Sequence, residues 1–249
     1  MSSTVRRYLE PLAFFTLLGV AWEVSVRYFE VKSYLLPALS DVFAAMWNSR
    51  ASLASHGLVT LIEVLVGFAG AVVIGAALAT AIFFIPSLQR TLFPFITAMQ
   101  SVPKVALAPL MIVWFGYGLT SKFVMAFLFA IFPIIIATLG GFSSTPSNLI
   151  EHFRALRASP WQTTWRLRIP SALPNFLDGC RIAIPLSMIG AIVGEFVGAQ
   201  RGLGYVIMMT SSSSQTDLMF AALITVALMS TALFMAFQML GRLVWWRSV

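Results

Sequence analysis

Long apolar stretches separated by short polar connections dominate the hydropathy pattern of this chain. A bilayer core of about 30 Å needs about 20 apolar residues per helix, and the pattern offers six stretches of this kind. We therefore predict an all-α, polytopic membrane protein with a single transmembrane domain over residues 1–249. The six predicted transmembrane helices cover about residues 9–29, 58–85, 92–115, 122–141, 175–197 and 218–243.

The third predicted helix is unusual because Pro94, Pro103 and Pro109 interrupt it. Each proline removes a backbone donor, so the helix must bend or break at these points. A membrane tolerates such a break only where protein or a water-filled cavity covers the freed backbone groups. Lys104 lies inside the interruption, so we expect a cavity near this residue.

A polar segment, residues 143–174, separates the fourth and fifth predicted spans. Its apolar residues recur at helical steps of three and four, which predicts two short amphipathic helices. An apolar helix face outside the membrane needs a partner to cover it, and a partner protein is the simplest expectation. The signals for these helices are a turn and N-cap at Thr145–Asn148, Glu151 near the first N-terminus, a break and a new start at Ser159–Pro160, and stops at Pro170 and Pro174.

Composition excludes a soluble globular domain. The chain is 59% hydrophobic and only 10% charged, with a mean hydropathy of +0.89, whereas soluble domains are about 25% charged. The net charge of +7 does not indicate a nucleic-acid partner, because the basic residues lie at the ends of the apolar segments; the lipid bilayer is the expected surrounding. The single Cys180 permits no internal disulfide and no cysteine-based metal site.

The basic residues also predict the orientation in the membrane, because Lys and Arg accumulate on the cytoplasmic side. With a cytoplasmic amino terminus, nine basic residues lie inside and five outside, which places both termini and the polar segment in the cytoplasm. The inside set is Arg6, Arg7, Arg90, Arg154, Arg157, Arg166, Arg168, Arg242 and Arg247, and the outside set is Arg27, Lys32, Arg50, Lys122 and Arg201.

No catalytic constellation and no metal site is visible in the sequence. The chain lacks the glycine-rich phosphate loop that would bind ATP, so if the protein takes part in active transport, the energy must come from another subunit. His56 and His152 lie far apart and lack a carboxylate and cysteine neighbourhood. We expect surface roles for both histidines.

Six ionisable residues fall within or beside predicted spans, where an unpaired charge costs at least about 2.5 kcal/mol. We expect Asp178 and Arg181 to pair on one helix, and Glu23 and Glu63 to pair with Arg27 or with backbone donors. Lys104, next to Pro103, and Glu195 are the candidates for the translocation path, because each adjoins helix-breaking or small residues. The alternative for these two is that they neutralise each other across the bundle.

The polar segment resembles the cytoplasmic loop of permease subunits of bacterial ATP-binding-cassette (ABC) importers. That loop has the pattern E-A-A, three residues, G, nine residues, I-x-L-P, and here Glu151, Leu167 and Ile169-Pro170 fill the matching positions. His152 and Phe153 replace the two alanines, and Arg157 replaces the glycine. Further segments resemble the permease branch that serves nitrate, sulfonate, taurine and pyrimidine-precursor importers: Ser101–Lys104, Ala108–Leu110, Trp114–Gly118, Gly194–Gly198 and Gly202–Tyr205.

The resemblance implies a permease subunit, not an enzyme, of the bacterial plasma (inner) membrane. Its expected cargo is a nitrate-, sulfonate- or taurine-like anion, or a vitamin or pyrimidine precursor. Its expected partners are an ATPase dimer that binds ATP and Mg, a second and identical permease subunit, and a soluble extracytoplasmic substrate-binding protein. The residues expected to form the coupling helix against the ATPase are Glu151, His152, Phe153, Arg154, Ala155, Leu156, Arg157, Ala158 and Ser159.

Two other classes of protein remain open at this point. An ion-coupled secondary transporter or channel would carry internal repeats or a chain of membrane acids, and the sequence shows no obvious repeat. A membrane scaffold would not need the proline-broken third span.

Overall fold

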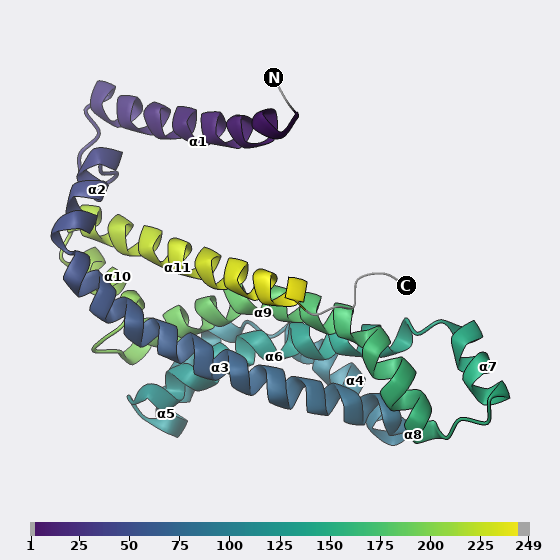
Figure 1. The fold of residues 1–249 in the computed structure, drawn as a ribbon. Coiled ribbons are helices and arrows are strands. Elements are labelled where there is room, and N and C mark those ends of the chain that lie inside the picture. Colours follow the sequence, from purple (N-terminus) through teal and green to yellow (C-terminus); the bar gives the residue numbers. More distant parts are fainter. Residues whose placement is uncertain (1–2, 244–249) are drawn as a thin grey trace.

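The structure, a computed structural model, describes residues 3–243, and every regular element in that range is a helix (Figure 1). The predicted all-α fold is confirmed. The expected domain ends, residues 1–2 and 244–249 with Arg247, lie outside the described residues. The elements are α1 (Ser3–Tyr28), α2 (Leu39–Asn48), α3 (Arg50–Phe84), α4 (Pro86–Gln100), η1 (Lys104–Leu107), α5 (Ala108–Phe115), α6 (Leu119–Ser143), α7 (Ser147–Ala155), α8 (Pro160–Thr163), η2 (Thr164–Arg168), α9 (Ile169–Gly198), α10 (Leu203–Ser212) and α11 (Thr216–Leu243).

Four helical stretches among the described residues are long and apolar enough to cross a membrane: Arg50–Phe84, Leu119–Ser143, Pro160–Gly198 and Thr216–Gly241. A fifth span results if α4 and the η1–α5 segment count as one broken helix. The first predicted span, α1, is a helix of 26 residues but is not among these stretches. The structure therefore supports four or five spans, and the count of six stays a prediction.

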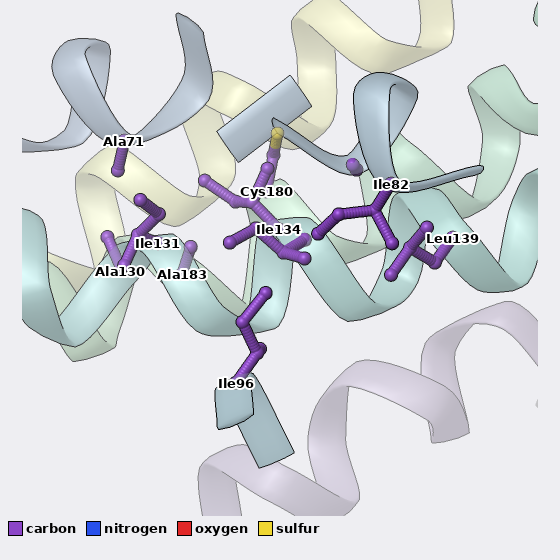
Figure 2. Packing of buried hydrophobic residues seen from close by; sticks show 11 residues of the cluster. Ala71, Ile82, Ile96, Ala130, Ile131, Ile134, Leu139, Cys180 and Ala183 are labelled. Atoms are coloured by element: carbon purple, nitrogen blue, oxygen red, sulfur yellow. The ribbon is translucent and has the colours of Figure 1, made fainter. Parts of the chain in front are cut away.

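The centre of the fold is a tight stack of α3, α6 and α9, with α6 packed along both of the others. Their backbones approach closely where small residues meet. A Cβ atom on Gly67 of α3 would lie 2.5 Å from the Cβ of Ala126 on α6, and close packing of this kind is typical of membrane helices. Figure 2 shows the largest apolar cluster, in which Ile82, Ile134 and Cys180 bring these three helices together.

Helix α1 lies apart from this stack (Figure 1). It contacts α2, and near its end the Trp22 indole donates a hydrogen bond to the Pro37 carbonyl and lies against the Phe220 ring of α11. Farther back, apolar side chains such as Phe15 and Leu17 are exposed, at 66% and 72% of their surface. The apolar surface of α1 therefore remains available to lipid or to another chain.

The fifth predicted span begins earlier in the structure than the sequence suggested. Helical structure runs without a break from Pro160 to Gly198, so the prediction that Pro170 and Pro174 end the second loop helix is wrong. The helix passes Pro170 after one wide π-helical turn at Thr164–Arg168. A π turn shifts the hydrogen-bond pattern by one residue, and this accommodates the donor that a proline lacks.

Candidate functional site

The polar segment between α6 and α9 lies at one end of the molecule (Figure 1) and holds one separate short helix, α7, followed by α8, which continues into α9. The prediction of two short helices is therefore wrong for the second helix. Ser159 caps α8 through its hydroxyl, which accepts the Gln162 amide hydrogen, while the Gln162 side chain accepts from the Ser159 amide. The predicted cap of α7 is wrong, because Pro146 is the N-cap residue and makes no side-chain bond. Glu151 lies beyond the first turn of α7 and so does not face its positive end.

The residues expected to couple to an ATPase are largely exposed. Of the stretch from Glu151 to Ser159, only Phe153 and Ala158 are half-buried. Leu156 exposes 67% of its surface, and the neighbouring Trp161 and Trp165 expose 69% and 52% while their rings contact each other. Arginines flank these apolar side chains. The segment therefore offers an apolar and basic surface that the described part of the chain leaves uncovered.

The break in the third span lies where the prolines predicted it. Helix α4 ends at Gln100, Pro103 is the N-cap of η1, and the two halves meet at an angle of 94°. Lys104 begins the second half, and its ammonium group lies 5.1 Å from the ring centroid of Phe132 on α6. A cation over an aromatic face is attracted to the ring electrons. Lys104 forms no ion pair with Glu195, so mutual neutralisation is not observed.

Glu195 is fully enclosed in the stack and caps another helix. Its Oε2 accepts a hydrogen bond from the Gly204 amide, and its Oε1 accepts one from the Thr60 hydroxyl at 2.6 Å. The Leu203 amide in turn donates to the Thr60 oxygen at 2.8 Å. The first amides of a helix lack partners within it and carry partial positive charge. Glu195 therefore stabilises the start of α10 from a different helix.

The third amide of this cap binds a histidine. The Gly202 N–H donates to His56 Nδ1 at 3.1 Å, and the imidazole lies over the Tyr205 ring. The surface role predicted for His56 is therefore wrong. We call the cluster of His56, Thr60, Glu195 and the 202–204 amides the α10 cap. Sequence reasoning missed His56 and Thr60, whose spacing of four on one helix face was the only available signal.

Two further buried ionisable groups adjoin the α10 cap. Glu63 of α3 is fully buried, and neither carboxyl oxygen has a hydrogen-bond partner, so the predicted pairing is not observed. Its carboxyl group interacts with that of Glu195 and with the Lys122 ammonium of α6. Lys122, only 4% exposed, donates to the Tyr117 and Gly118 carbonyl oxygens. From the sequence, Lys122 was predicted only to be a basic residue at the outer end of a transmembrane helix.

The other ionisable residues predicted within the spans, Glu23, Asp178 and Arg181, form ion pairs with residues three or four positions away on the same helix, as predicted. Arg27 contacts Glu23 at 2.6 Å one turn away, and the Ser40 amide also donates to Glu23. Arg181 binds Asp178 on α9. Groups of three or more side chains suited to a metal ion are not found among residues 3–243.

The comparison with known families decides the class of this protein. The family described as "Binding-protein-dependent transport system inner membrane component" matches residues 71–246. The chain belongs to this family of ABC importer permeases. The membership settles the choice among the open classes in favour of a permease, a transport component of the membrane.

Two relatives support this assignment along most of the permease chain. The formylaminopyrimidine transport permease protein ThiX of Halalkalibacterium halodurans is 40% identical over 79% of this chain and 79% of its own. The riboflavin transport system permease protein RibX of Chloroflexus aurantiacus is 37% identical over 91% of this chain and 85% of its own.

The fold of the permease also has a solved counterpart. A chain of the MetNI methionine ABC transporter, from a crystal form with inward-facing conformations, superimposes with a TM-score of 0.62 at 22% identity. The alignment covers 84% of this chain and 98% of that chain. At this identity the likeness concerns the fold, which is that of an ABC transporter membrane subunit.

Proposed function

We propose that two copies of this permease form a membrane path through which an ATPase dimer drives the uptake of a small solute. Membership in a binding-protein-dependent family supports this assembly, with a soluble extracytoplasmic protein that delivers the solute. ATP and Mg²⁺ would bind to the ATPase subunits. The permease would change between outward and inward access as the ATPase dimer closes and opens.

The exposed surface of the α7–α8 segment is the observation that carries this proposal. Leu156, Trp161 and Trp165 are large apolar side chains at the tip of a polar segment, and arginines surround them. Aromatic and arginine side chains are enriched at the centres of protein interfaces. A groove of the ATPase subunit would cover them, and the coupling stretch Glu151–Ser159 would transmit the motion.

The first test is co-purification of the tagged permease from its native membrane, followed by an ATPase assay. We expect a cytosolic ATPase to co-purify. Glu151→Lys replaces the acidic residue of exposed α7 with a basic one, next to Arg154 of the same helix, and we expect it to uncouple ATP hydrolysis from uptake. Ser87→Lys, an equally exposed position on α4, is the control. Wild-type uptake in the Glu151→Lys variant would remove this segment from the mechanism.

A second copy of the permease is the partner we propose within the membrane. The span at Thr216–Gly241 is only 11% buried within one chain, and α1 exposes most of its apolar side chains. Lipid would cover part of these surfaces and a second copy the rest. Cross-linking of single-cysteine variants on α1 in native membranes tests whether the permease is a dimer. Dimer bands support two copies, and monomer alone at every position contradicts the dimer.

The broken third span is the part of the path that we propose to contact the solute. Pro103 opens the helix, and Lys104 brings a cation without an acidic partner, which would attract an anionic group. Lys104→Met should reduce uptake of such a solute more than Lys104→Arg does. Glu195 would influence the path through the α10 segment that it holds.

The cargo class is proposed from both the relatives and this lysine. ThiX and RibX are named for transport of a formylaminopyrimidine and riboflavin, so a vitamin precursor is one candidate, and a sulfonate-like anion is the other. Radiolabelled uptake with the cognate binding protein distinguishes them.

We also propose cytoplasmic termini, which accessibility of tags in intact cells and in inverted vesicles tests.

A further inference from the structure

The carboxyl end of α3 carries an aromatic cluster that includes the end of α6. Phe83 of α3 is stacked on Phe142 of α6, with ring centroids 5.0 Å apart, and the Phe84 ring lies edge-on to both. Phe142 is buried and Phe83 is half-buried. Stacked and edge-on rings are the favourable arrangements of aromatic side chains. The cluster therefore holds the ends of α3 and α6 against each other.

Arg168 of the π-helical turn η2 adds a third helical element to this cluster. Its guanidinium group lies 5.0 Å from the ring centroid of Phe83. Arg168 is half-buried, whereas Arg166 in the same turn is exposed. A guanidinium group is attracted to the face of an aromatic ring, and its flat shape allows it to stack there. Arg168 therefore joins η2 to α3 through a side chain, although the two elements are far apart in the sequence.

The segment that contains η2 has two routes into the membrane-spanning helices. The covalent route enters α9, which follows the π-helical turn and holds Pro174 and Pro185 in its interior. The other route passes through Arg168 into α3, whose 35 residues from Arg50 to Phe84 contain no proline. Helices bend at prolines and at π-helical turns. The route through α3 therefore lacks the bending points of the route through α9.

At its other end, α3 carries two residues of the α10 cap. Thr60 and His56 bind the amides of Leu203 and Gly202. About 35 Å of helix separates Phe83 from Thr60 at 1.5 Å per residue. A displacement of α3 at the aromatic cluster therefore reaches the start of α10.

We propose that Arg168 is a positioning residue for transport, which ties the ATPase-facing α7–α8 segment, to which η2 belongs, to α3 through the Phe83 ring. A displacement of this segment then moves α3 and the α10 cap together with α9. Without the stack, the segment stays attached to α6 and α9 through the chain, but α3 no longer follows it. The inference rests on the proposed function, because it requires an ATPase that moves the segment.

The experiment follows a thiol on α10 and needs no knowledge of the solute. Cys180 is buried and is the only cysteine in the chain, so Cys180→Ala with Met209→Cys places one thiol at an exposed position of α10. The rate at which N-ethylmaleimide labels the permease is measured in the co-purified complex, with and without ATP and Mg²⁺. The ratio of the two rates reports whether ATP at the ATPase changes α10.

Two substitutions remove the two sides of the stack. We expect Arg168→Leu and Phe83→Leu each to weaken the ATP effect about threefold or more, the factor that corresponds to a cation over a partly exposed ring. The double variant should behave like either single variant, because both changes break the same contact. Arg168→Lys keeps the charge without the flat group and should retain part of the effect, whereas Phe83→Tyr keeps the ring and should retain most of it.

Arg50→Leu is the matched control. Its guanidinium group lies 4.7 Å from the Trp47 ring at the opposite end of α3, so the change removes a similar stack between residues that are neighbours in the sequence. The ATP effect should be unchanged in this variant, and an equal loss there would overturn the proposal. A full ATP effect in Arg168→Leu would also overturn it. So would loss of the co-purified ATPase in Arg168→Leu, since Arg168 would then be a docking residue.

Failure of this inference and failure of the proposed function give different results. If no ATPase co-purifies with the unchanged permease, the proposed function is refuted, and the inference that rests on it falls too. If the ATPase co-purifies but ATP leaves the labelling rate of the unchanged permease constant, only the transmission to α10 is refuted. If the leucine variants fail to fold, the conservative variants decide. A larger loss in Phe83→Tyr than in Arg168→Lys, or no loss in either, then contradicts the stack.

Discussion

The α10 cap and the α7–α8 segment, residues 147–168, differ in how far their functional groups are buried and bonded within the chain. In the α10 cap, three successive amides bind His56, Thr60 and Glu195 from other helices, and the groups are buried or half-buried. In the α7–α8 segment, the hydrogen bonds are local, and the large side chains have no cover. One region is complete within the chain, whereas the other leaves its large apolar side chains exposed.

This difference separates residues that hold the permease together from residues that contribute little to its stability. A buried polar group that loses its partner costs about 1 to 3 kcal/mol, whereas an exposed side chain changes stability by less than about 0.5 kcal/mol. Variants of the two regions should therefore differ sharply in the stability of the isolated permease.

The largest loss of stability is expected for Glu195→Leu. The change leaves the Gly204 amide without its acceptor and leaves the Thr60 hydroxyl with only the His56 carbonyl at 3.3 Å, so we expect the free energy of unfolding to fall by about 3 kcal/mol. Thermal unfolding of the purified permease in detergent measures it. Glu151→Leu on exposed α7 is the control, and equal melting temperatures for the two variants would refute the contrast.

A somewhat smaller loss is expected for Gly202→Ala. Gly202 has a φ of +111°, and a Cβ atom there would collide with the Glu195 carboxylate. We expect backbone strain and displacement of the carboxylate together to lower the free energy of unfolding by about 2 kcal/mol. Gly116 has a φ of +77° but open space around it. The melting temperature should therefore fall less in Gly116→Ala, and the opposite order would show that the collision is not important.

A loss of about 1 kcal/mol is expected for Thr60→Val, because the Leu203 amide loses its acceptor and Glu195 loses one donor. Thr80 lies on the same helix but bonds only to the Ala76 carbonyl one turn away. Thr80→Val should leave the melting temperature nearly unchanged. If the two valine variants have equal melting temperatures, the hydrogen bonds of Thr60 to Leu203 and Glu195 contribute nothing to the stability of the α10 cap.

The smallest effect on stability is expected when Trp161 and Trp165 are both changed to alanine, since both rings are exposed. The same variant should lose most of the co-purifying ATPase, measured by pull-down against the unchanged permease. Trp114→Ala, with 64% of that side chain exposed on α5, is the control and should retain the ATPase. Full retention by the double variant would place the docking surface elsewhere.

Patterns that repeat along the chain made the fold predictable. Apolar length placed the carboxyl ends of the helices closely, whereas α3, α4 and α9 begin at least six residues earlier than predicted. Pro103 correctly located the break between α4 and α5, while Pro94 lies inside α4. Ser159 with Gln162 formed the predicted second start. These features depend on residues close together in the sequence, so the sequence pattern alone predicts them.

Contacts between distant residues were not predictable in the same way. The bond from Leu203 to Thr60 joins positions 143 residues apart, and nothing in the spacing of either sequence segment specifies it. For the same reason the sequence suggested a partner for Glu63 and a surface role for His56. The stop at Pro170 failed because it directly follows a π-helical turn, in the first turn of α9, and the stop at Pro174 failed although that proline lies inside the α-helix.

The uninterrupted helix from Pro160 to Gly198 links the two regions mechanically. Its 39 residues correspond to about 58 Å at 1.5 Å per residue, with the exposed tryptophans at one end and Glu195 at the other. Between its two ends the helix contains the π-helical turn at Thr164–Arg168 and two internal prolines, Pro174 and Pro185, at which it can bend. The exposed tryptophans and the carboxylate that holds the start of α10 therefore lie on one continuous helix, and a displacement of one end can reach the other without passing through a loop.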